Sequence, residues 1–257
     1  MQLSLLQYGL GLLAGSMIGF ILSLVGGGGS ILAVPLMLYL VGVRDPHVAI
    51  GTGALAVAAN AATGLIGHAR VRTVRWKPGA AYAASGIVGA LAGAALGKAF
   101  DGGRLLFLFA CLMLIVAVMM LCRSRAGGAA GHAGGGTSWP RLFGYGAGTG
   151  TLAGFFGIGG GFLIVPGLVT ATGMPMIEAV GTSLIAVLAF GLTAAGSYAV
   201  SGFVDWPLAA SFVLGGIFGG TGGVALARRL ASFSGRLELV LAGLISVVAV
   251  WMIFRSL

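Results

Sequence analysis

Two stretches of the chain, Ala80–Gly97 and Leu105–Leu121, run for 18 and 17 residues without a charged side chain. As α-helices they are close to the length that crosses the hydrocarbon core of a bilayer, about 30 Å thick. Only 7% of the residues are charged, whereas soluble domains carry about a quarter. The runs do not alternate apolar and polar residues as β-barrel strands do. We therefore expect an all-α polytopic membrane protein in the cell (inner or plasma) membrane.

The formal net charge of +9 comes from 14 Lys and Arg against five Asp and Glu. A basic chain can bind nucleic acid, but here the positive residues lie between apolar runs, where they fix membrane orientation. We therefore expect the lipid bilayer, and no nucleic acid, as a partner.

The two halves of the chain are related. A shift of 131 positions aligns six residues of the same type, Gly26, Gly28, Gly29, Leu32, Val34 and Pro35 with Gly157, Gly159, Gly160, Leu163, Val165 and Pro166. A shift of 130 aligns five more, Ala49, Gly51, Thr52, Thr63 and Trp76 with Ala179, Gly181, Thr182, Thr193 and Trp206. A Gly- and Ala-rich stretch lies between the halves and is typical of a flexible linker. We predict an N-terminal membrane repeat at 1–122, a flexible cytoplasmic linker at 123–140 and a C-terminal membrane repeat at 141–257.

The charges of two equivalent loops predict opposite orientations for the repeats. Loop 69–77 holds four positive residues and should be cytoplasmic, whereas loop 201–207 holds only Asp205. We therefore expect two inverted-topology repeats of about five membrane segments each. If the chain crosses the membrane ten times, ten of the 14 Lys and Arg lie inside, as the positive-inside rule expects. The four outside are Arg44, Lys98, Arg104 and Arg255. The first two segments of each repeat are short, and they form either two short spans or one re-entrant hairpin around a glycine-rich break.

The glycine-rich breaks, "VGGGGSILAVP" and "GIGGGFLIVP", are the strongest candidates for a site. Successive glycines let the chain turn sharply and let a ligand approach the backbone N–H groups. A helix is expected directly after each break, with Ser30 as a possible N-cap of the first. Its first amides lack internal partners and its N-terminus is partly positive, which suits an anion. Other glycines are expected only to pack helices together: Gly86, Gly89, Gly93, Gly215, Gly219 and Gly223.

Polar side chains inside apolar segments complete the candidate site. The matching "GTG" and "GTS" motifs supply hydroxyls, which could instead bond back to their own helices. Asn60 aligns with Phe190, and an amide in the middle of a membrane helix is costly without a partner. The candidate substrate-binding residues are Gly26, Gly27, Gly28, Gly29, Ser30, Gly157, Gly159, Gly160, Gly161, Thr52, Thr182, Ser183 and Asn60.

All five acidic residues fall near segment ends, whereas proton- and sodium-driven carriers commonly keep a carboxylate within the span. Zinc-ligand spacing, a Ser–His–Asp set and a phosphate-binding Gly-Lys-Ser/Thr loop are absent from the sequence. We therefore expect no enzyme activity, cofactor or metal.

The paired "GGGGSILAVP" and "GIGGGFLIVP", followed by "GTGALAV" and "GTSLIAV", resemble the TauE/SafE family of membrane permeases, the sulfite exporter or toluenesulfonate-uptake family. The resemblance covers essentially the whole chain. It implies transport of small sulfur-containing anions such as sulfite, sulfoacetate or other organosulfonates. The two motifs differ, Gly-Gly-Gly-Gly-Ser against Gly-Ile-Gly-Gly-Gly, so the two half-sites differ as well.

The resulting hypothesis is a secondary transporter, an exporter of a small sulfur-containing oxyanion such as sulfite or an organosulfonate, working by alternating access between the repeats. The expected partners are this small anionic substrate and the bilayer, and a homo-oligomer is left open. Three alternatives stay open: an anion channel, an uptake permease for another small organic anion, and a non-transporting membrane scaffold.

Overall fold

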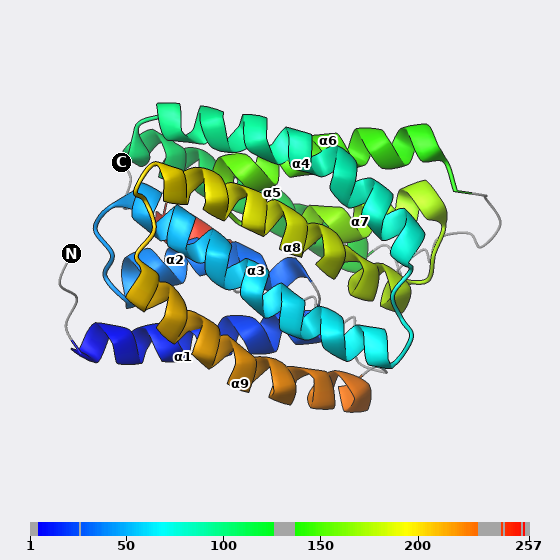
Figure 1. Ribbon diagram of the computed structural model, residues 1–257, viewed down its shortest axis with the longest axis horizontal. Helices are drawn as coiled ribbons and strands as arrows, with labels where there is room; N and C mark the ends of the chain where they lie inside the picture. Colours follow the sequence, from blue (N-terminus) through cyan, green and yellow to red (C-terminus); the bar gives the residue numbers. More distant parts are fainter. Residues whose placement is uncertain are drawn as a thin grey trace.

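The computed structural model describes residues 5–25, 27–125, 137–230, 243, 245–252 and 254, and every element within them is helical (Figure 1). The elements are α1 (Leu5–Val25), the 3₁₀-helix η1 (Gly27–Leu32), α2 (Ala33–Pro35), the π-helix η2 (Leu36–Leu40), α3 (Pro46–Arg70), α4 (Trp76–Ala99), α5 (Gly102–Arg125), α6 (Trp139–Phe156), α7 (Gly161–Thr172), α8 (Met176–Val200) and α9 (Trp206–Leu230). The all-α prediction is confirmed for these residues.

The predicted linker falls largely outside the described residues, as do Gly26 and much of the last apolar segment. α5 continues to Arg125 and α6 begins at Trp139, so helix occupies both ends of the range 123–140 predicted as linker.

Five of the described helices are long and apolar enough to cross a membrane: α3, α4, α8 and most of α1 and α5. α7, with 12 residues, is about 18 Å long and cannot cross a core of about 30 Å. The multi-pass prediction is confirmed, while α7 and the η1–η2 segment need a different arrangement.

Local sequence explains where several helices begin and end. Asp45 caps α3 by accepting a hydrogen bond from the His47 amide at 2.8 Å, and Pro46 occupies the first helical position, where no amide is needed. Gly157 and Gly173, both with positive φ, follow the last residues of α6 and α7.

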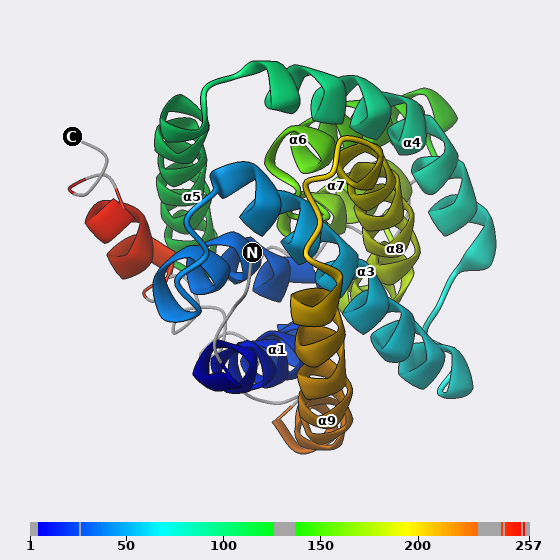
Figure 2. The same ribbon diagram turned by 60° about the vertical axis from the view of Figure 1, so that its left-hand side comes forward.

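Two parallel helix pairs, α1 with α9 and α4 with α6, form the sides of the bundle (Figure 2). Glycines allow their backbones to touch. A Cβ added at Gly15 would lie 2.0 Å from the Phe212 carbonyl oxygen, and one at Gly93 would lie 2.0 Å from that of Thr151. The same holds for Gly86, Gly89, Gly215 and Gly219, where an added Cβ would lie within 2.3 Å of a neighbouring atom. The prediction that these glycines pack helices together is confirmed.

α3 and α8 lie antiparallel against each other and are the most buried of the candidate spans, with 72% and 61% of their apolar windows inside the bundle. The start of α3 meets the end of α8, since Gly51 packs on Tyr198, and their middles meet at Gly191 and Ala58. This pair forms the centre of the molecule.

The loops that follow α3 and α8 are built alike. The amide of Thr73 donates to the His68 carbonyl at 3.2 Å, and that of Phe203 donates to the Tyr198 carbonyl at 2.9 Å. Each loop has one residue with positive φ, Arg72 (57°) and Gly202 (76°). The loops lie at opposite ends of the bundle, which we name the Arg75 end and the Asp205 end after the residues that precede α4 and α9.

Candidate functional site

The first glycine run lies at the tip of a helical hairpin formed by α1 and the η1–η2 segment. The side-chain amide of Gln7, near the start of α1, donates to the Val41 carbonyl beyond η2 at 3.1 Å. At the tip, a Cβ on Gly29 would lie 2.7 Å from the Leu22 amide nitrogen, so η1 packs back on α1. The chain therefore enters and leaves at the same end, as a re-entrant hairpin requires.

Within this hairpin the role predicted for Ser30 is wrong. The helix does not begin after the glycines: η1 already starts at Gly27, so Ser30 lies inside it. Residue Leu32 occupies the N-cap position of the following α-turn, without a side-chain cap. The glycines have no Cβ and can form the tight 3₁₀ turn themselves, which moves the helix start upstream of the serine.

α6 and α7 form a second hairpin with the same design. The amide of Ser138, just before α6, donates to the carbonyl of Ala171 near the end of α7 at 2.9 Å. The intervening turn contains Gly157, Gly159 and Gly160 with φ of 62°, 65° and 64°. Side chains rarely adopt this left-handed region, so the glycines permit the reversal. α7 then begins at Gly161, as the sequence predicts.

The second glycine turn reaches the centre of the bundle. A Cβ on Gly157 would lie 2.3 Å from Ile50 Cγ2, and one on Gly159 would lie 3.0 Å from Val187 Cγ1 and 3.1 Å from Val57 Cγ1. Val57 and Val187 are both twelfth residues of 25-residue helices, α3 and α8. η1 also packs against α7, so the element that holds the first glycine run lies beside the helix that follows the second.

The start of α7 follows directly on this turn, and the first N–H groups of a helix have no partner one turn earlier within it. Leu163 and Ile164 donate to the Gly160 carbonyl at 2.9 and 3.2 Å. The N-terminus of α7, with the positive end of its helix dipole, therefore lies beside Val57 and Val187 at the centre of the bundle.

A buried pair of hydroxyls, not identified from the sequence, lies beside this hairpin. Tyr82 of α4 and Thr149 of α6 are 2.9 Å apart through their oxygens, and a Cβ on Gly167 of α7 would lie 2.6 Å from the Tyr82 hydroxyl. Tyr82 follows alanines in an apolar run, and its only sequence signal is its hydroxyl.

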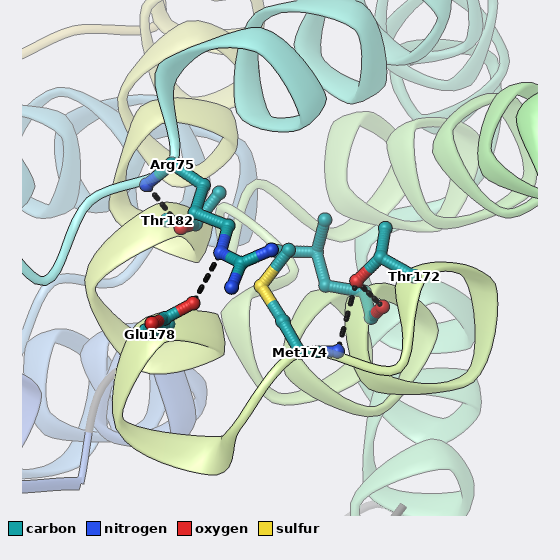
Figure 3. Close-up of polar contacts among 6 residues, drawn as sticks. Arg75, Thr172, Met174, Glu178 and Thr182 are labelled. Atoms are coloured by element: carbon teal, nitrogen blue, oxygen red, sulfur yellow. Dashed lines mark hydrogen bonds and ion pairs between the residues drawn. The ribbon is translucent and has the colours of Figure 1, made fainter. Parts of the chain in front are cut away.

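The hydroxyls of Thr52 and Thr182 hold loops rather than converging on the glycines. Thr182 accepts a hydrogen bond from the Arg75 amide at 2.9 Å (Figure 3), and Thr52 accepts one from the Asp205 amide at 3.0 Å. Each threonine thus holds the residue that precedes a helix of the other half.

These two threonines are far apart. Thr52 lies at the level of Tyr198, which is 16 positions beyond Thr182 on α8, or about 24 Å along the helix. One small anion cannot contact both hydroxyls. Ser183 donates to the Val180 carbonyl of its own helix at 2.8 Å, the back-bonding alternative.

At the Arg75 end, an ion pair joins the halves next to Thr182. The Arg75 guanidinium donates to Glu178 in the first turn of α8 (Figure 3). The equivalent positions at the other end hold Asp205 and Val48, which cannot pair. The two ends of the bundle are therefore closed by different contacts.

Asn60 of α3 packs against α9, one helical turn beyond Val57. It is 1% exposed, and a Cβ on Gly216 would lie 1.9 Å from its Oδ1. Neither polar atom of its amide has a hydrogen-bond partner in the part of the chain that the structure describes. The sequence identifies this residue as a candidate, and the structure buries its side-chain amide without a hydrogen-bond partner among the described residues.

A helical bundle with several candidate spans and two hairpins broken at glycines inside it belongs to the class of multi-pass membrane transporters. Comparison with family models agrees: the model described as "Sulfite exporter TauE/SafE" matches residues 11–252. The chain belongs to this family, which is a family of transporters and not of enzymes.

Relatives with curated descriptions match along most of their length. A "Probable membrane transporter protein" of Xylella fastidiosa (strain 9a5c) is 47% identical over 247 residues, which cover 95% of this chain and 94% of the relative. The "Probable membrane transporter protein YunE" of Bacillus subtilis (strain 168) is 30% identical over 242 residues, 86% of this chain and 87% of the relative. No solved structure matches the chain.

Proposed function

We propose that this chain is a secondary transporter that exports a small sulfur-containing oxyanion, such as sulfite or an organosulfonate. The observation that carries the proposal is the pair of glycine-tipped hairpins: they pack against each other, and the second reaches the centre of α3 and α8. A helix N-terminus enclosed by apolar helices favours a small anion over a cation, because the end of its dipole is partly positive. The family description supports sulfite and its organic analogues as the class of anion.

In this proposal the oxyanion is held by main-chain N–H groups of the two glycine segments. Gly159, Gly160 and Gly161 supply the second half-site, and Gly27 to Gly29 supply the first. Thr52 and Thr182 act as loop contacts, because each already accepts a hydrogen bond from an amide of the other half.

Alternating access requires two halves that can rock against each other. Equivalent contacts at the two ends of the bundle support two repeats of inverted orientation. Thr52 accepts a hydrogen bond from the Asp205 amide and Thr182 accepts one from the Arg75 amide, and the 130-position shift relates the two contacts. Four positive residues in loop 69–77 favour the Arg75 end as cytoplasmic. The Arg75–Glu178 pair would then have to open when the site faces the cytoplasm.

The positions of the acidic residues support export. The acids in the described residues lie at helix ends: Asp45, Asp101 and Asp205 precede helices, and Glu178 lies in a first turn. A negative interior drives an anion outward with about 2.3 kcal/mol per charge per 100 mV, so export needs no carboxylate within the span.

Uptake of labelled sulfite into proteoliposomes tests the proposal. Gly159→Leu places a side chain against Val57 and Val187 at a residue with positive φ, and we expect it to abolish flux. Gly159→Ala is the milder variant, for which reduced flux is expected. Gly148→Leu, on an open face of α6, is the matched control and should transport normally.

Flux that persists in folded Gly159→Leu would contradict the glycine site. Saturable flux at the rates of a carrier is expected, whereas electrical currents far above such rates would identify a channel.

A further inference from the structure

The amide of Asn60 belongs to a buried polar cluster that the oxyanion site does not use. Ser23 of α1 (2% exposed) and Thr63 of α3 lie on the same side, facing α9. A Cβ on Gly220 would lie 3.2 Å from Ser23 Oγ, 3.7 Å from Thr63 Oγ1 and 3.8 Å from the Gly19 carbonyl oxygen. Gly216, which faces Asn60, is one helical turn before Gly220. Two helices, α1 and α3, thus bring oxygen atoms around two glycines that lie one turn apart on α9.

The equivalent place in the other half is apolar. A shift of 130 positions puts Phe190 where Asn60 lies and Gly86 where Gly216 lies, and a Cβ on Gly86 would lie 2.0 Å from the Phe190 ring. There the ring fills the space against the glycine. Ser23 corresponds to Gly154 by the 131-position shift, so its hydroxyl also has no counterpart. Of the three side chains, only Thr63 has a polar counterpart, Thr193, so the Asn60 amide and the Ser23 hydroxyl are specific to one half and are not required by the helix packing that both halves share.

The cluster is rich in acceptor oxygens. The Thr63 hydroxyl donates its proton to the main-chain carbonyl of Asn60 at 2.7 Å, which leaves the lone pairs of the hydroxyl available. Asn60 Oδ1 has no partner among the described residues. Ser23 lies in the last turn of α1, which ends at Val25, and the carbonyls at a helix C-terminus carry partial negative charge.

We propose that Ser23, Asn60 and Thr63 form a binding site for a monovalent cation of the sodium type. Neutral hydroxyl, amide and carbonyl oxygens at the end of a broken helix are the ligands that transporters offer to such ions. Divalent cations favour carboxylates, and none of the described carboxylates lies in this cluster. The site uses side chains and a cation, whereas the oxyanion proposal uses the main chain of the glycine turns, so it goes beyond that proposal.

Binding of labelled sodium to the purified full-length chain in detergent tests the site. The medium contains chloride as its only anion and choline to hold ionic strength constant. We expect saturable binding by the wild type that choline does not displace. Asn60→Phe copies the Phe190 pair of the other half and should abolish binding. Ser23→Ala and Thr63→Val should weaken it by about tenfold or more.

Thr193→Val is the matched control, because Thr193 is the repeat equivalent of Thr63 and bonds only to the Ala189 carbonyl of its own helix. It should bind sodium as the wild type does. If Asn60→Phe does not fold, the Ser23 and Thr63 variants decide. Absence of saturable binding by the wild type, or unchanged binding in all three site variants, would overturn the proposal and leave water as the partner of Asn60. Because this assay contains no sulfur oxyanion, its failure is distinct from failure of the sulfite flux.

Discussion

At the scale of single residues, two threonines connect the halves of the molecule. Thr52 and Thr182 are fully buried, and each accepts a hydrogen bond from the backbone amide that precedes a helix of the other half. The 130-position shift aligns these two threonines, and the structure gives them equivalent hydrogen bonds. Sequence reasoning assigns both hydroxyls to one substrate site, because a motif carries no information about the end of the bundle at which it lies.

Replacing either threonine with valine keeps its shape but leaves a buried amide without its partner. We expect Thr52→Val and Thr182→Val each to lower the free energy of unfolding by about 1–3 kcal/mol, and the double variant to be roughly additive because the sites are distant. Thermal unfolding in detergent measures this. Thr170→Val, at an exposed residue bonded within its own helix, is the control. Lost sulfite binding at unchanged stability would instead indicate that these hydroxyls contact substrate.

At the scale of elements, glycines have two distinct roles. Along α4 and α6 they allow parallel helices to touch, and in the two hairpin tips they allow the chain to reverse. Sequence reasoning distinguished these roles, because four adjacent glycines exceed what helix packing needs. It left open whether the short segments span or re-enter the membrane. That choice depends on contacts such as Gln7 with Val41 and Ser138 with Ala171, which join residues far apart in sequence.

Neighbouring glycines of α6 provide a test of the packing role. A Cβ on Gly150 would lie 2.1 Å from the Gly86 carbonyl oxygen, whereas one on Gly148 meets nothing within 4 Å. Gly150→Ala should therefore force α4 and α6 apart and destabilise the protein by about 1–3 kcal/mol. Gly148→Ala should be neutral or slightly stabilising, because alanine favours helix. Equal unfolding temperatures for the two variants would contradict this packing.

At the scale of the whole molecule, the two halves exchange equivalent contacts. The α1–α9 and α4–α6 pairs correspond, as do the loops that follow α3 and α8. The internal shift of 130 to 131 positions made this correspondence visible in the sequence. The asymmetries were harder to foresee: the Arg75–Glu178 pair at one end and the Asn60 cluster in one half depend on which side chains face each other across helices.

Cysteine labelling tests the inverted arrangement. Val71 and Ser201 are exposed repeat equivalents in the loops after α3 and α8. In a chain with Cys111 and Cys122 replaced by alanine, a membrane-impermeant maleimide should label Ser201→Cys on intact cells. It should label Val71→Cys only after permeabilisation. Labelling of both from the same side would exclude inverted repeats.

The central claim is that the glycine turns at the middle of the bundle hold an oxyanion. Equilibrium binding of labelled sulfite to the purified chain tests it most directly. Saturable binding is predicted for the wild type and for Gly148→Leu, and loss of binding for folded Gly159→Leu. Saturable binding that Gly159→Leu leaves unchanged, or none by the wild type, would contradict the claim.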